Sequence, residues 1–152
     1  MASPGDVAAR GTLLYGAYLS GVALGTTSTG LHHKLCHVLG GRFNLVHADA
    51  HSVVLPHAIA FNAPALPVEM ARLADALGVP GGDPAAALWD LAVASKVPTR
   101  LADLSGHDGL LKREDLPGAA HEAADEITVN PRPVNEADLL GILERAYEGA
   151  RP

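Results

Sequence analysis

Three histidines in the first third of the chain stand at spacings that suit metal binding or acid–base chemistry. His33 and His37 are four residues apart, and this spacing places both imidazoles on one face of a helix. His47 follows a Gly40-Gly41 turn, and a loop of this length can return its side chain to the first pair. Such a trio is a partial ligand set for Zn, Fe or Ni. The alternative, histidines packed in a core or an interface, is equally compatible with the spacing.

Two side chains of this stretch are candidates for catalysis. His37 is the strongest candidate acid or base, because the ordinary pKa of an imidazole is about 6.5. Lys34 has no acidic residue one helical turn away, so it is a candidate anchor for a substrate carboxylate; a solvated helix residue is the alternative. The other histidines are interpreted as packed or surface residues: His32, His51 and His57 in the core or an interface, and His107 and His121 on the surface.

The composition narrows the class of protein. Of the 152 residues, 48% are hydrophobic and 18% are charged, and these proportions exclude a disordered chain. The formal net charge of -6 argues against nucleic-acid binding, which needs a basic face. No apolar run is long enough to span a membrane, and the N-terminus lacks the pattern of a secretory signal. Cys36 is the only cysteine and is interpreted as a buried structural thiol, so a cytoplasmic protein is predicted.

Hydrophobic periodicity predicts one all-α domain over residues 1–152, a bundle of six or seven helices. Gly40-Gly41 is expected to end the second helix, and Pro56 to kink the third or start a new turn there. The segment at 52–55 could instead be a buried strand, but no partner strand is evident. The predicted helices cover residues 5–26, 30–39, 47–62, 67–78, 83–97, 112–128 and 135–149.

The first predicted helix is apolar on all sides and carries glycines at positions 11, 16, 21 and 25. A helix without a polar face is either buried or covered by a partner. We therefore expect a homodimer or another partner to cover residues 5–26.

The stretch HKLCHVLGGRFNLVHADAHSVVLPHAIAFN resembles the signature of the helical domain of iron-containing alcohol dehydrogenases. It is most similar to the maleylacetate reductase branch, and LYGAYLSG and NPRPV elsewhere in the chain resemble that branch as well. The resemblance covers nearly the whole chain. It implies the C-terminal helical fold of this family, which is of the dehydroquinate synthase-like type.

The resemblance also implies roles for individual residues. His33 and His47 match two histidine ligands of the family's metal, Fe or Zn, and His37 matches the histidine beside the nicotinamide that is implicated in proton transfer. The maleylacetate reductases, which this pattern resembles, often work without a bound metal, and the resemblance then implies that the histidines serve the substrate carboxylates and the enol oxygen. Val46 replaces the usual proline and Asp49 a common glutamate.

The family's nucleotide-binding domain, with its Gly-rich phosphate loop, has no counterpart in this sequence. The family's aspartate ligand and first histidine ligand lie in the helical domain, upstream of the position that corresponds to Met1. We therefore expect an incomplete metal ligand set, and binding of NAD(P)H only through a partner chain.

Three functions are compatible with these features. The first is one half of a split reductase that acts on a 2-oxo or enol carboxylic acid. The second is a repurposed domain that performs cofactor-independent acid–base chemistry, such as isomerisation, cyclisation or elimination, on a carboxylate or apolar small molecule. The third is a non-catalytic interaction domain. The split reductase is preferred, because its partner would supply the missing nucleotide domain.

Overall fold

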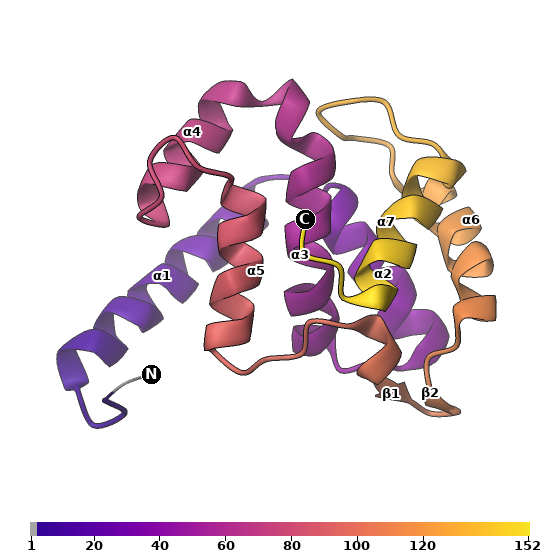
Figure 1. Cartoon of the computed structure of the whole chain (residues 1–152), viewed down its shortest axis with the longest axis horizontal. Helices are drawn as coiled ribbons and strands as arrows, with labels where there is room; N and C mark the ends of the chain where they lie inside the picture. The colour runs from indigo at the N-terminus through magenta and orange to yellow at the C-terminus, as the bar shows by residue number, and fades with distance from the viewer. Residues whose placement is uncertain (1–2) are drawn as a thin grey trace.

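The computed structural model describes residues 3–152 and contains seven α-helices within them (Figure 1). An all-α bundle was predicted, and this prediction is confirmed. The helices are α1 (Val7–Thr26), α2 (Leu31–Phe43), α3 (His47–Asn62), α4 (Pro67–Ala76), α5 (Pro84–Ala94), α6 (Leu116–Glu126) and α7 (Glu136–Glu148). Three short 3-10 turns, at Ala63–Ala65, Leu101–Asp103 and Arg113–Asp115, and a hairpin of β1 (Ser105–Gly106) with β2 (Gly109–Leu110) complete the described chain.

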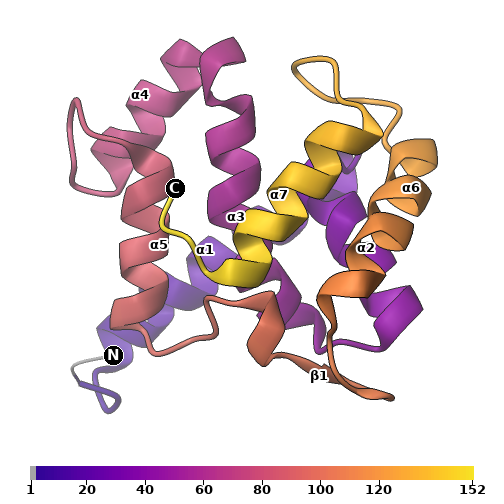
Figure 2. The same ribbon diagram turned by 45° about the vertical axis from the view of Figure 1, so that its right-hand side comes forward.

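The core lies between α2, α3, α6 and α7, and α5 packs on the other side of α3 (Figures 1 and 2). Its large side chains are nearly all leucine, isoleucine and valine, and small alanines let α6 approach α2 and α7 closely. The largest fully buried side chains are Leu31, Leu35, Leu39, Leu101, Leu116, Leu139, Ile142, Leu143, His57, Val38, Val53 and Val54. This packing sets α2 and α3 side by side, and these two helices carry the histidines.

Helix α2 is longer than predicted. It continues through Gly40 and Gly41 to Phe43, and it ends where Asn44 adopts a left-handed conformation with φ of 55°. A glycine inside a helix costs about 1 kcal/mol relative to alanine, and the burial of Leu39 and Leu45 on either side of the pair favours the packed helix over a break. Only Asn44–Val46 then connects α2 to α3, so the next helix must turn back directly beside it.

Helix α3 continues past Pro56, which is buried within it. The helix does not end and restart at Pro56, so no new turn begins there, and the alternative of a strand at 52–55 is wrong. A proline removes one helical N–H, a cost that tertiary packing offsets here because its neighbours Val53, Val54 and Ala58 are all buried. A single rigid helix thus carries the residues from His47 to Asn62.

Helix α7 is the amphipathic helix that the sequence predicts. The Asn135 side chain accepts a hydrogen bond from the backbone N–H of Asp138, and Gly149 ends the helix with φ of 68°. The four predicted inward residues, Leu139, Ile142, Leu143 and Ala146, are all completely buried.

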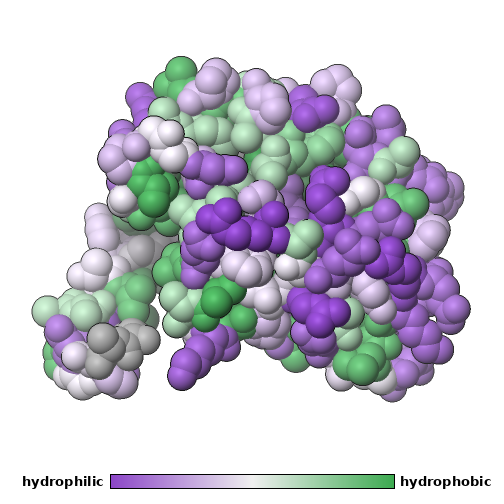
Figure 3. Space-filling view, viewed as in Figure 1, coloured by the Kyte–Doolittle hydropathy of each residue, from purple (hydrophilic) through white to green (hydrophobic). Residues whose placement is uncertain are grey.

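Helix α1 projects from the body of the molecule (Figure 1), and none of its residues is buried. Asp6 caps it by accepting from the N–H of Ala9, as predicted. Hydrophobic surface is visible along this projecting helix in Figure 3. Within residues 3–152, no helix combines the length and the apolar character that crossing a membrane requires.

Candidate active site

Four imidazoles gather where α2 and α3 lie against each other. His33 and His37 are one turn apart on α2, with ring centroids 4.5 Å apart, and His47 and His51 are one turn apart on α3, at 4.2 Å. The two pairs also touch across the helix boundary, because the His33 ring lies 5.7 Å from His47 and 4.7 Å from His51. The structure thus brings together the three histidines that the sequence predicts and adds His51.

His51 is the site residue that sequence reasoning interpreted as structural. The signal was present in the sequence, because His47 and His51 have the same four-residue spacing that singled out His33 and His37. The spacing of His51 and His57 does not place these two residues on one helical face, so it gave no reason to expect His51 in the site. Its ring contacts two histidines of the group, His33 and His47, and also His32 outside it, so the fold places His51 within the candidate site.

The cluster is partly open to solvent. His37 and His47 are exposed, whereas His33 and His51 are half-buried. Burial lowers the pKa of His33, and the nearby His37 and His47 would repel a proton there as well. Burial, together with repulsion from His32 and His47, lowers the pKa of His51 to about 4. Neutral imidazoles, which these shifts favour, are the form that ligates metals.

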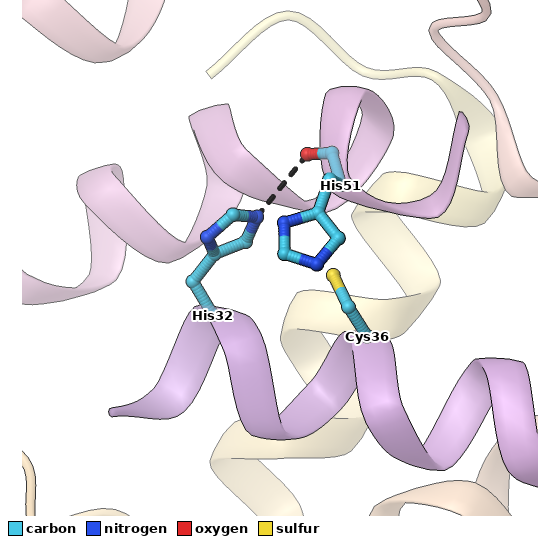
Figure 4. Close-up of side chains that lie close together, drawn as sticks. All are labelled: His32, Cys36 and His51. Carbon is cyan, nitrogen blue, oxygen red and sulfur yellow. Dashed lines mark hydrogen bonds between the residues drawn. The ribbon is translucent and has the colours of Figure 1, made fainter. Parts of the chain in front are cut away.

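A second group shares His51. The ligand atoms of His32, Cys36 and His51 lie within 4.8 Å of one another (Figure 4). The Nε2 atom of His32 is 3.2 Å from the backbone carbonyl oxygen of His51, so this ring is already engaged in linking α2 to α3. Cys36 is completely buried, as predicted, and burial raises the pKa of its thiol to about 12.

The remaining histidines lie where the sequence predicts. His57 is completely buried in α3 and both of its ring nitrogens lack a hydrogen-bond partner. Burial, with a contribution from Arg145, lowers its pKa to about 4. His107 and His121 are on the surface, 2.9 Å from carboxylate oxygens of Asp108 and Glu136 respectively.

Lys34 has an ionic partner that the local sequence could not reveal. Its Nζ lies 3.5 Å from an oxygen of Glu126 at the end of α6, and both side chains are partly exposed. The pair spans 92 residues of sequence, so no inspection of one helical turn could find it. Lys34 therefore holds α2 to α6 in addition to any role towards a ligand.

The donor set at the face between α2 and α3 fits a divalent metal ion. One ligand atom each from His33, His47 and His51 lies within 4.8 Å of the others, and imidazole nitrogen suits Zn and Fe. Residues 1–147 match the sequence profile of the Fe-containing alcohol dehydrogenase family, C-terminal. The chain belongs to the Fe-containing alcohol dehydrogenase family. Within this family it corresponds to the helical C-terminal domain, as the sequence motif implied.

Several relatives in this family are maleylacetate reductases. The chain is 46% identical over 151 residues to the maleylacetate reductase of Sphingobium indicum and to that of Burkholderia cepacia, covering 99% of this chain and 41% of each relative. The crystal structure of maleylacetate reductase from Agrobacterium tumefaciens shares this fold with a TM-score of 0.87 and 41% identity, over 99% of this chain and 41% of that one. The chain therefore spans less than half the length of the relatives it matches.

Proposed function

We propose that this chain forms the histidine-bearing part of a reductase active site, and that its substrate is a 2-oxo or enol carboxylic acid. The proposal rests on one observation. The His33/His37 pair of α2 and the His47/His51 pair of α3 lie in contact with each other, and the cluster is partly exposed to solvent. The chain's 46% identity to maleylacetate reductases supports the substrate class. A nucleotide-binding part outside these 152 residues, in a separate subunit, completes the enzyme.

His37 is the proton donor in this proposal. Its ring is exposed and lies beside His33 and His47, so it can reach a substrate held over the cluster. If bound, a nicotinamide would supply the hydride, either to the carbonyl carbon of a 2-oxo acid or to a C=C bond conjugated with a carbonyl. His37 gives its proton to the anion that remains, an alkoxide in the first case and an enolate in the second, which balances the charge and completes the reduction.

The substrate carboxylate needs a cation, and Lys34, the residue after His33, is close enough for its charge to contribute to the lowered pKa of His33. Its pair with Glu126 is partly exposed, and such surface pairs are worth about 0–1 kcal/mol. Exchange of Glu126 for a substrate carboxylate is therefore inexpensive. If Fe or Zn were bound, His33 and His47 would hold it, and the chemistry it would supply is polarisation of the substrate oxygen.

Helix α1 supports the need for a covering partner. Its large apolar side chains are between 45% and 82% exposed, and burying one fully is worth about 1.5–3 kcal/mol. Its glycines have no atom near the position of a Cβ, so another backbone can approach closely. A second copy of this chain would also cover α1, and a homodimer is the alternative arrangement.

Co-expression tests the proposal. This chain would be produced with the part of the Sphingobium indicum reductase that precedes the matched region. We expect a complex that oxidises NADH when maleylacetate is added. His37→Asn should lower kcat by about 10²–10⁴-fold without loss of the complex, and the exposed His107→Asn serves as the matched control.

Two outcomes would contradict the split reductase, and a third would contradict only the role of His37. Turnover of a 2-oxo or enol acid without any nucleotide would favour stand-alone acid–base chemistry. The structure gives that alternative less support, because His37 and His47 are exposed and a substrate beside them would stay in contact with water. A folded chain that forms neither the complex nor any turnover, yet assembles with other copies, would favour a non-catalytic interaction domain. Unchanged turnover in His37→Asn would remove His37 from the mechanism.

A further inference from the structure

We infer that a cavity at the end of α2, outside the histidine cluster, binds a small carboxylic acid that carries an apolar body. The cavity has a volume of about 300 Å³ and is lined by the last turn of α2, the β1–β2 hairpin and the segment that precedes α6. These three segments meet at one end of the bundle (Figure 1). None of the four clustered histidines lines this cavity, so the inference goes beyond the proposed reductase.

The hairpin wall of the cavity is held against the end of α2. The backbone N–H of His107 donates a hydrogen bond to the carbonyl oxygen of Phe43 at 3.2 Å. A Cβ atom on Gly106 would collide with that same oxygen, so the close approach requires glycine. The backbone N–H of Leu111 donates to the carbonyl oxygen of Leu104 at 3.0 Å and closes the hairpin. The cavity is therefore formed before a ligand enters, and binding does not have to order the hairpin.

Two cations line the cavity, and neither is fully engaged by its acidic neighbour. The Nη1 atom of Arg42 donates to a carboxylate oxygen of Glu122 at 3.2 Å, which uses only one of the several N–H donors of a guanidinium. The Nζ atom of Lys112 lies 3.9 Å from an oxygen of Glu114, and these two side chains are 67% and 78% exposed. Exposed pairs of this kind contribute little to stability, so both cations can turn to a ligand carboxylate.

The two acidic residues that line the cavity are engaged elsewhere. A carboxylate oxygen of Asp115 accepts a hydrogen bond from the backbone N–H of Lys112 at 3.3 Å. Asp108 is 91% exposed and lies 2.9 Å from the Nε2 atom of His107, so water largely screens its charge. The chain as a whole is acidic, with a formal net charge of -6. An arginine and a lysine on one cavity therefore provide a local attraction for an anion that the overall charge of the protein does not.

The guanidinium of Arg42 lies against the first turn of α6. A Cβ atom on Gly118, the third residue of that helix, would come within 2.7 Å of the Nη2 atom of Arg42. A side chain at this position would therefore displace the guanidinium. The beginning of a helix carries a partial positive charge, which adds to the attraction for an anion beside Arg42. Because a carboxylate can accept two parallel hydrogen bonds from one guanidinium, Arg42 is the expected anchor of the ligand.

An apolar wall beside these cations sets the rest of the ligand. Leu45 and Leu111 are buried, Phe43 is half-buried and Leu110 is 58% exposed, and all four line the cavity. The ring centre of Phe43 is 5.7 Å from the Cζ atom of Arg42, so a ligand can reach both with its two ends. Covering apolar surface is favourable. Since about 300 Å³ is at the lower end of the range for ligand cavities, a single ring or a short branched chain fits.

Titration of the purified 152-residue chain with benzoate, followed by NMR of the backbone amides, tests the inference without nucleotide or a partner chain, so its outcome is independent of the proposed reductase. We expect saturable shifts of the amide signals of Gly106 and Gly109, and much weaker binding of benzamide, which has the same ring without the charge. Arg42→Gln should weaken benzoate binding by about tenfold or more, because a hydrogen bond to a charged group is lost. The matched control Arg72→Gln, on the exposed side of α4, should leave binding unchanged.

Gly118→Ala provides a second variant that keeps both cations. Alanine favours a helix over glycine, so α6 should remain folded while the added methyl group displaces the guanidinium and weakens binding. Three results would overturn the inference: equal binding of benzamide, undiminished benzoate binding by either folded variant, and the absence of saturable shifts at Gly106 and Gly109, including shifts confined to the histidine cluster. Far-ultraviolet circular dichroism establishes folding. If Arg42→Gln fails to fold, Gly118→Ala and the comparison with benzamide still decide the question.

Discussion

Helices α1 and α7 begin with the same kind of N-terminal cap, but α7 is packed into the core and α1 is exposed. Each has a side-chain cap, with Asp6 accepting from the N–H of Ala9 at 3.0 Å and Asn135 from that of Asp138 at 2.9 Å. Four apolar residues of α7 form one stripe that is completely buried against the core, whereas the large apolar residues of α1 surround the helix and stay exposed. Local sequence is sufficient to make both helices. Of these two helices, only α7 is packed into a core by the residues that the structure describes, 3–152.

The largest predicted effect comes from truncating one leucine in each helix. Leu143→Ala leaves a cavity in the core, and we expect it to lower the free energy of unfolding by about 2–5 kcal/mol. Leu14 is 71% exposed, so Leu14→Ala should change the free energy by no more than about 0.5 kcal/mol. Urea unfolding of the isolated chain measures both. Equal losses that depend on protein concentration would mean that α1 is covered by a second copy in solution.

Removal of the caps should give a smaller effect of the same kind. Asn135→Ala leaves an N–H of α7 without its partner and should cost about 1 kcal/mol of global stability. Asp6→Ala should reduce the helical signal of α1 but leave the thermal midpoint of the core unchanged, because no residue of α1 is buried. Circular dichroism melts of the two variants provide the measurement. A lower midpoint in Asp6→Ala would show that α1 and the core unfold as one unit.

The smallest effect concerns the ion pair that ties α7 to α6. A hydrogen bond from the imidazole to the Glu136 carboxylate, and its charge, raise the pKa of His121. The folded pKa exceeds the unfolded one, so the stabilisation is present below about pH 6.5 and is lost as the pH rises through the raised pKa. NMR titration of His121 should show this raised pKa, and Glu136→Gln should return it towards the ordinary value. A pKa that Glu136→Gln leaves unchanged would exclude the pair as its cause.

Periodic patterns in the sequence were sufficient to predict the helices that have one apolar face. The inward residues of α7 and the caps at Asp6 and Asn135 follow from spacing and residue type alone. The end of α2 did not follow, since Gly40 and Gly41 weaken a helix by an amount that burial of neighbouring leucines outweighs. The helix boundary was thus decided by packing against residues far away in the sequence.

For the candidate site, the sequence by itself determined that His33 and His37 share a helical face, since a four-residue spacing has that consequence in any helix. The motif around them determined the family. Only the tertiary structure decided that His51 belongs with them while His57, on the same helix, is sealed in the core. It also decided that Lys34 meets Glu126. Spacing sets the face of one helix, but the role of each imidazole depends on which neighbouring helix covers that face.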